Sequence, residues 1–201
     1  MTSRRSAVVA IVIAIAVVAG CSSDESDGFQ SAPTASPSGP LSVQWGAPET
    51  SQMCFPGTAD DGTVTIGGHM VTNSRGIPIK LLDYRLGVGS VNMDIIAKLV
   101  IPVLPEKGGY VSLFGSWPSY PPIELLDAMY RNEFERAVSV DGFELQNEDR
   151  AEIVVGLAQV DESLPSFLSY IDVVYEYDGS RYHAYTPTAV TITGNANECP
   201  R

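Results

Sequence analysis

The chain has 201 residues and a formal net charge of −12 at pH 7, with 12 Lys and Arg against 24 Asp and Glu. Phosphate backbones and anionic lipid headgroups repel such a surface, which argues against nucleic acid as a partner and against membrane attachment through a basic patch. The apolar fraction of 44% is ordinary for a globular protein and argues against wholesale disorder.

The N-terminus carries the most specific pattern in the sequence. Arg4 and Arg5 make a positive start, and an uninterrupted apolar run follows over residues 7–19. The run is shorter than the roughly 20 residues that a transmembrane helix needs. A positive start before a short apolar run is typical of a secretion signal.

The end of this run, Val18-Ala19-Gly20-Cys21, resembles the lipobox of bacterial lipoproteins. Small residues at 19 and 20 let a peptidase approach the backbone, and the Cys21 thiol accepts the diacylglycerol. The resemblance implies that residues 1–20 are removed as a signal peptide. Cys21 then anchors the mature chain, with a net charge of −14, to the extracytoplasmic face of the cell membrane.

A polar segment follows the lipobox, with the sequence SSDESDGFQSAPTASPSGP over residues 22–40. It has one aromatic and no other large apolar residue, so it cannot bury enough surface to offset its ordering entropy. The expected organisation is a signal peptide at 1–20, a lipidated disordered tether at 21–40 and one folded domain at 41–201. The 161 residues of that domain are enough for a hydrophobic core.

The domain contains short apolar runs broken by turn residues, which predict a mainly β structure. Expected strands cover 62–72, 77–86, 93–103, 109–115, 152–160, 171–177, 180–186 and 188–193. Pro78 indicates that the second of these is an edge strand or begins late.

The clearest local unit is a hairpin within 171–186. Asp178-Gly179 favours a two-residue turn between its strands. That turn places Tyr175 opposite Tyr182. It also places Glu176 opposite Arg181, and both pairs are favourable neighbours across a sheet.

One stretch breaks the β pattern. Apolar residues after Pro121-Pro122 recur at intervals of three and four, namely Ile123, Leu126, Tyr130, Phe134 and Ala137. Asp127 and Arg131 lie four residues apart with the acid first, which favours a helix. We therefore predict one amphipathic helix that begins at the prolines and lies across an end or face of the sheets.

Seven or eight short strands with regular turns predict a two-sheet sandwich. Residues 152–161 and 175–187 resemble segments of the immunoglobulin-like domains of bacterial envelope lipoproteins. The expected fold class is therefore mainly β, an immunoglobulin-like two-sheet sandwich with one short helix. This resemblance implies a fold and no activity, because function belongs to sites and not to folds.

Cys54 and Cys199 remain after lipidation uses Cys21. An even pair in an oxidising compartment predicts a disulfide, which here joins the start of the domain to its end. This departs from antibody-type domains, whose disulfide bridges the two sheets. The alternative is a reactive or metal-binding pair, although the sequence has no CxxC motif.

Motifs for catalysis, cofactors or metals are absent from the sequence. His69 and His183 are the only histidines, and both are expected to be surface or half-buried strand residues. His69 beside Met70 suggests a soft-metal ligand pair as the alternative. The chain lacks GxSxG, a phosphate loop and GxGxxG. No catalytic, cofactor-binding or metal-binding residue is therefore assigned.

Two pairs of carboxylates are considered for a glycosidase-like mechanism, because such enzymes need only two acids. Asp60-Asp61 lies in an expected turn, where neighbouring side chains point apart into solvent. The second pair, Glu133 and Glu135, lies on the expected helix. We assign no catalytic role to either pair.

An aromatic and proline-rich segment is the better candidate for function. Trp117 and Tyr120 lie among three prolines, and both residue types are favoured anchors at protein contacts. They form a candidate protein-contact patch. The alternative is that both side chains tuck into the domain and close the end of the sandwich.

The sequence thus predicts a membrane-tethered, non-catalytic binding or interaction module of the cell envelope. Its expected contacts are the lipid membrane through Cys21 and another envelope protein or a cell-wall component, with no nucleic acid and no cofactor. Two alternatives remain open. One is a hydrolase of envelope carbohydrate that uses carboxylates, and the other is a carrier of a small ligand or metal.

Overall fold

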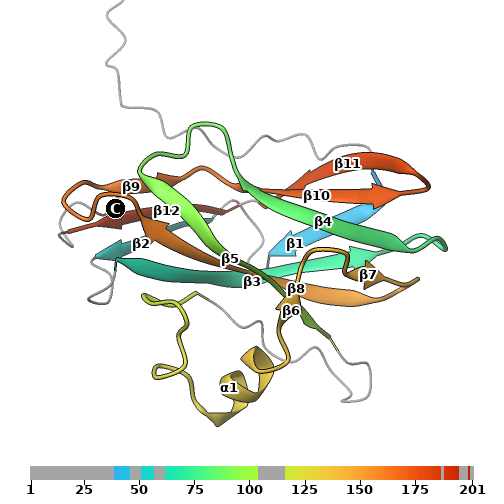
Figure 1. Cartoon of the computed structure of the whole chain (residues 1–201), viewed down its shortest axis with the longest axis horizontal. Helices are drawn as coiled ribbons and strands as arrows, with labels where there is room; N and C mark the ends of the chain where they lie inside the picture. The colour runs from blue at the N-terminus through green and yellow to red at the C-terminus, as the bar shows by residue number, and fades with distance from the viewer. Residues whose placement is uncertain are drawn as a thin grey trace, which may run out of the picture.

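The computed structural model describes residues 39–45, 51–56, 62–103, 116–186, 188–194 and 199. The described chain is mainly β, with one short helix (Figure 1). The strands and helix are β1 (Leu41–Trp45), β2 (Ser51–Pro56), β3 (Thr63–Asn73), β4 (Ile79–Leu86), β5 (Met93–Pro102), α1 (Ala128–Phe134), β6 (Val138–Ser139), β7 (Glu144–Leu145), β8 (Arg150–Gln159), β9 (Ser166–Leu168), β10 (Ile171–Tyr177), β11 (Ser180–Tyr185) and β12 (Thr188–Thr193).

The strands form three hydrogen-bonded sheets. A five-stranded sheet has the order β1-β3-β8-β5-β6, a four-stranded sheet the order β11-β10-β4-β7, and a three-stranded sheet the order β2-β12-β9. Strands β9 and β10 follow one another in the chain, as do β11 and β12, and the pairs β10–β11 and β9–β12 are both antiparallel. The three-stranded sheet therefore continues the four-stranded one.

The hydrophobic core lies between the five-stranded sheet and the two smaller sheets. Its fully buried members alternate along the strands, as expected where one face of each strand points inward. They include Val64 and Ile66 of β3, Ile153 and Val155 of β8, Ile79 and Leu81 of β4, Val173 and Tyr175 of β10, and Val190 and Ile192 of β12.

A second, smaller cluster covers the outer face of the five-stranded sheet. Val154 of β8 and Ile101 of β5 pack there against the segment 117–137, which includes α1. In Figure 1, α1 lies on the side of β3, β5 and β8 that faces away from β10 and β11. Because both of its faces are covered, β8 has a nearly continuous apolar sequence.

These observations confirm the predicted fold class, a mainly β sandwich with one short helix. The expected strands at 62–72, 77–86, 93–103, 152–160 and 188–193 correspond to β3, β4, β5, β8 and β12. Strand β4 begins after Pro78, as predicted. The hairpin has the predicted register, with Tyr175 paired to Tyr182 and Glu176 to Arg181. The expected strand at 109–115 lies outside the described residues.

The predicted start of the helix is wrong. Helix α1 begins after Asp127, whose carboxylate accepts the N–H groups of Met129 and Tyr130 and caps the helix. The residues after Pro122 form a turn instead. Asp127 therefore does not pair with Arg131, which donates to backbone carbonyls of the preceding turn.

The predicted disulfide between Cys54 and Cys199 is confirmed, with a Cα–Cα distance of 5.7 Å. Cys54 lies in β2, which pairs in parallel with β12. The bond therefore joins β2 to the chain beyond β12. Two cysteines joined in a disulfide are not free thiols, which rules out the alternative of a reactive or metal-binding pair.

The expected signal peptide and lipobox, and residues 21–38 of the expected tether, lie outside the described residues. Of the remaining tether residues, Pro40 is buried against the domain. Within the described ranges, no helix has both the length and the apolar character needed to cross a membrane.

Candidate functional site

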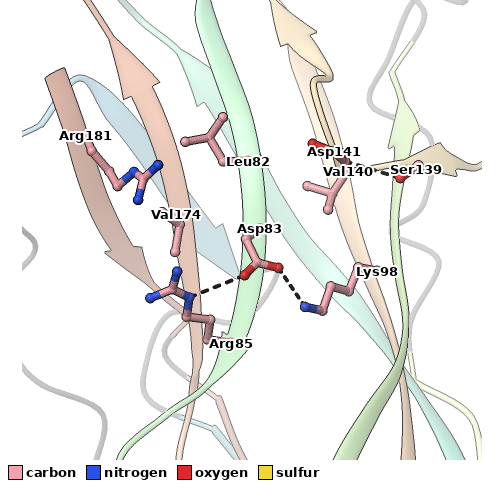
Figure 2. Close-up of a pocket in the computed structure, with 9 residues that line it drawn as sticks. All are labelled: Leu82, Asp83, Arg85, Lys98, Ser139, Val140, Asp141, Val174 and Arg181. Carbon is pink, nitrogen blue, oxygen red and sulfur yellow. Dashed lines mark hydrogen bonds and ion pairs between the residues drawn. The ribbon is translucent and has the colours of Figure 1, made fainter. Parts of the chain in front are cut away.

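A pocket with a volume of about 430 Å³ opens beside β4, and we call it the charged pocket. Its charged lining residues are Asp83 and Arg85 of β4, Lys98 of β5, Arg181 of β11 and Asp141 after β6 (Figure 2). Leu82, Ser139, Val140 and Val174 complete the lining. Three cations thus meet two acids in a chain whose formal net charge is −12.

A β-bulge in β4 orients the first two of these residues. Leu81 pairs with Tyr175 of β10 and Asp83 pairs with Val174, so Leu82 is an extra residue in β4. Leu81 faces the core before the bulge and Tyr84 faces it afterwards. The bulge therefore reverses the alternation of β4 and turns Asp83 away from the core.

A second bulge orients Lys98. In β5, Ile95 pairs with Leu157 and Ala97 pairs with Gly156, so Ile96 is the extra residue. Val100 faces the core after this bulge, and Lys98 shares its face of the strand. The ammonium group can therefore reach across the side of the sandwich to β4, which belongs to the opposite layer.

The two bulges bring Asp83 and Lys98 together. The Lys98 Nζ lies 2.6 Å from Oδ1 of Asp83, and the Arg85 Nε lies 3.3 Å from Oδ2. Figure 2 shows the two cations on either side of the carboxylate. The Asp83 side chain is 32% exposed, against 37% for Lys98 and 54% for Arg85, so water reaches all three groups.

The two cations determine the charge state of Asp83. Partial burial by itself raises the pKa of this carboxyl, but hydrogen bonds from Lys98 and Arg85 outweigh it and lower the pKa below its ordinary value of 3.8. The backbone N–H of Tyr84 contributes in the same direction. Asp83 is therefore ionised at neutral pH and is a poor general acid.

The opposite wall of the pocket is held against β5. Val140 donates its N–H to the Lys98 carbonyl at 3.1 Å, and the Asp141 N–H donates to Ser139 Oγ at 3.3 Å. On the other side, Val174 of β10 lines the pocket but is only 1% exposed. The pocket therefore combines fixed backbone walls with charged groups at the ends of flexible side chains.

A hydrogen bond between His183 and Asp172 lies next to the pocket, on β11 and β10. The His183 Nδ1 lies 3.0 Å from both carboxylate oxygens of Asp172, and Asp172 pairs in register with Arg85. His183 pairs with Val174, so its contact with Asp172 is diagonal. The predicted hairpin register places His183 and Asp172 on one face as diagonal neighbours. Their contact could therefore have been predicted from the sequence, but it was not.

The predicted position of His69 on the surface or half-buried is wrong, since the side chain is 0% exposed. Its Nε2 lies 2.8 Å from Thr188 Oγ1 of β12, inside the core. Burial lowers the pKa of His69 to about 3, so the imidazole is neutral at physiological pH. Met70, the next residue of β3, points to the opposite face, and the two side chains therefore cannot hold one metal ion together.

A third bulge explains the orientation of His69. Gly67 and Gly68 together oppose a single residue of β8. This extra residue reverses the alternation of β3, so that His69 faces the core instead of the outside. Gly68 has a φ of +85°, a conformation that favours glycine. Its N–H donates to Oε1 of Glu152 at 2.6 Å, which satisfies a group taken out of the strand ladder.

Trp117 and Tyr120 pack against the domain. The Trp117 ring contacts Tyr130 of α1 with centroids 6.0 Å apart, and Tyr120 contacts Phe134 at 6.4 Å. Two backbone hydrogen bonds of 2.8 Å also join Trp117 to Thr65 of β3. This packing favours the alternative in which both aromatics tuck into the domain, although they cover the outer face of a sheet and not the end of the sandwich.

The candidate carboxylate pairs do not form a site among the described residues. Glu133 is buried on α1, and burial raises its pKa, while Glu135 is exposed. Asp60 and Asp61 lie outside the described residues. In the part of the chain that the structure describes, no group of three or more His, Cys, Asp or Glu is placed to hold a metal ion.

Comparisons with known proteins add little. No family model matches the chain, and no curated protein matches it. Among solved structures, the VesB protease of Vibrio cholerae aligns with 76% of this chain and 31% of its own, at 7% identity and a TM-score of 0.35. A likeness this low carries no argument about activity.

Proposed function

We propose that the protein is a membrane-tethered lipoprotein that acts as a non-catalytic binding module in the cell envelope. The proposed location depends on the signal pattern of residues 1–20 and on Cys21 at its end. The Cys54–Cys199 disulfide supports it, because structural disulfides persist in extracytoplasmic compartments and are rare in the cytosol.

The charged pocket is the observation that carries the binding role. Side chains from both layers of the sandwich converge in it, and the Asp83–Lys98 ion pair joins the layers at 2.6 Å. Sites built on sheets hold their groups more firmly than sites built on loops, so less entropy is lost when a ligand binds. The partner in this proposal is another envelope protein or a cell-wall component.

The hydrolase alternative is weaker at this pocket. Its two acids are Asp83 and Asp141, and a glycosidase needs one carboxyl with a raised pKa to act as general acid. The pKa of Asp83 is lowered by its cations. The carrier alternative, in its small-ligand form, is compatible with the pocket and shares the binding test described below.

Replacing the anchor cysteine tests the tether. In a bacterial host, the wild-type chain is expected to lose residues 1–20 and to carry acyl chains on Cys21, because the lipobox directs both steps. The Cys21→Ser variant is expected to lack the lipid. Mass spectrometry of the purified protein and partition between detergent and water measure both outcomes.

A Ser22→Ala variant is the matched control and is expected to remain lipidated. Partition of the wild-type chain into the aqueous phase, with Met1–Gly20 still present and an unmodified Cys21 thiol, contradicts the proposed location. Affinity purification of the lipidated chain from a detergent-solubilised envelope then tests the partner. Recovery of no reproducible envelope component contradicts the interaction role.

A further inference from the structure

The cations of the charged pocket have donor groups that Asp83 does not use. An ammonium or guanidinium group carries several N–H donors, whereas Asp83 takes one contact from Lys98 Nζ and one from Arg85 Nε. Arg181 takes no part in these ion pairs, and within the described residues its guanidinium forms no salt bridge. The pocket can therefore accept further oxygen atoms.

The lining of the pocket carries one more cation than acids, although Asp172 pairs with Arg85 and Glu176 with Arg181 in the strand register. Its lining carries Arg85, Lys98 and Arg181 against Asp83 and Asp141, while the whole chain has twice as many acids as bases. A long polyanion would meet repulsion from the rest of this surface. A small anionic group inside the pocket lies closest to the lining cations, so the charge distribution favours such a group, free or carried by an envelope component, over a long polyanion.

Geometry adds a preference for oxyanions. A guanidinium group presents parallel N–H donors that match the two oxygens of a carboxylate or phosphate, and an ammonium group acts as a point charge beside them. Val174 of β10, which lies between β4 and β11, also lines the pocket but is almost fully buried (Figure 2). A volume of about 430 Å³ lies in the range typical of small-molecule sites.

We propose that the charged pocket binds the oxyanion of a small ligand, with Arg181 and Lys98 as the main contacts and Arg85 beside them. This inference deepens the binding role proposed above and depends on it. The ligand carries a carboxylate or a phosphate and few other charges. Asp83 acts as a positioning residue, since its carboxylate holds Lys98 and Arg85 at the pocket from opposite sides.

Titration of the purified full chain with sodium acetate and, separately, with inorganic phosphate tests the proposal. Backbone amide NMR signals report the site, and those of Asp83, Arg85 and Asp141 are expected to shift with a saturable dependence on at least one probe. A stronger response to acetate identifies a carboxylate ligand, and a stronger response to phosphate identifies a phosphate ligand. Acetamide, which is neutral and similar in shape to acetate, is expected to give no saturable shift.

Variants of the cations separate specific binding from general attraction. Arg181→Gln and Lys98→Met are each expected to weaken binding of the preferred probe about tenfold, the effect of losing one charge-assisted hydrogen bond. Lys80→Met and Arg75→Gln are the matched controls, since both residues are exposed cations outside the pocket. Arg181 is itself exposed on β11, so its variant is expected to fold normally even if loss of Lys98 disturbs the sandwich.

Three outcomes overturn the proposal: no saturable shift with either anion, an equal response to acetamide, or equal effects of Arg181→Gln and Arg75→Gln. Any of these results shows that the charged pocket does not recognise an oxyanion specifically. Such a result leaves the lipidation of Cys21 and the recovery of an envelope partner untouched. The failure of this inference is thereby distinguishable from the failure of the proposed function.

Discussion

His69 is a titratable side chain that the fold keeps neutral. It lies on the inner face of β3 with no exposed surface, and its ring contacts Thr188 of β12. An imidazolium ion at this position would lose its hydration, and for this reason burial lowers the pKa of His69 from 6.5 to about 3. Protonation is therefore linked to unfolding.

This linkage predicts a specific loss of stability in acid. Above pH 6.5 His69 is neutral in both states, and its contribution is fully present. Between pH 6.5 and about 3 only the unfolded chain binds the proton, so the free energy of unfolding falls as the pH falls, by up to about 1.4 kcal/mol per pH unit. Urea unfolding of wild type and His69→Gln at about pH 7 and about pH 4.5 measures this slope.

The variant is expected to lose about 2–3 kcal/mol less than wild type between the two pH values, because glutamine does not titrate there. It is also expected to be somewhat less stable at pH 7, where the core is repacked around a new side chain. His183→Gln is the control, since His183 is partly exposed. Equal acid sensitivity of wild type and His69→Gln would show that His69 is not the group responsible.

At the scale of elements, the strands were easier to predict than the direction of their side chains. Apolar runs and turn residues located β3, β4, β5, β8 and the hairpin. The bulges at Leu82, at Ile96 and at Gly67-Gly68 reverse the alternation within three of these strands. Each bulge depends on pairing with a distant strand, so local periodicity does not reveal it.

The charged pocket shows the consequence of these bulges. Asp83 and Lys98 meet only because the bulges in β4 and β5 reverse which residues of each strand face the core. Arg181 lines the same pocket from β11, which lies far from both strands in the sequence. None of the three was a candidate on sequence grounds. Trp117 and Tyr120 were the predicted contact residues instead, because a sequence gives the type of each residue but not its burial.

The segment that contains Tyr120 fits closely on β8, and this fit gives a prediction for Gly156. A Cβ atom at Gly156 would lie 2.6 Å from Cδ2 of the Tyr120 ring. Gly156→Ala is therefore expected to displace the ring from its contact with Phe134 and to reduce the free energy of unfolding by about 1–3 kcal/mol. Chemical denaturation measures the change, and Gly76→Ala, with no heavy atom within 4 Å of the new Cβ, is the control.

A double-mutant cycle identifies the cause of this loss. In a Tyr120→Ala background the ring is absent, so the added methyl group at Gly156 is expected to cost much less than in wild type. If Gly156→Ala lowers the free energy of unfolding equally in both backgrounds, the destabilisation comes from the β8 backbone and not from contact with the Tyr120 ring.

On the scale of the whole molecule, the fold class and the disulfide followed from composition and spacing. Their prediction needed the number of strand-like segments and the assignment of one of the three cysteines, Cys21, to lipidation, which leaves Cys54 and Cys199 as a pair. The split of the second layer into two sheets was not predicted, because it depends on pairing between strands that lie far apart in the sequence, such as β2 with β12 and β4 with β10.

The Cys54–Cys199 disulfide acts on the whole chain, because it closes a loop with a sequence separation of 145. Its main effect is expected in the unfolded state, where it forbids most of the extended conformations that an open chain can adopt. Loop-closure entropy sets an upper value of about 5 kcal/mol for a loop of this length, and typical disulfides contribute about 2–4 kcal/mol. The double variant Cys54→Ser, Cys199→Ser is therefore expected to unfold at a lower urea concentration by an amount in that range.

Wild-type protein treated with a reductant distinguishes the effect of the bond from the effect of the two side chains. If the bond stabilises the fold through the unfolded state, reduced wild type and the double variant should have similar stabilities, and both should lie below the oxidised protein. The native β2–β12 pairing should remain in both, since backbone hydrogen bonds form it independently of the sulfur atoms. Equal stability of oxidised and reduced wild type would instead mean that the unfolded chain is already compact enough for the cross-link to exclude few conformations.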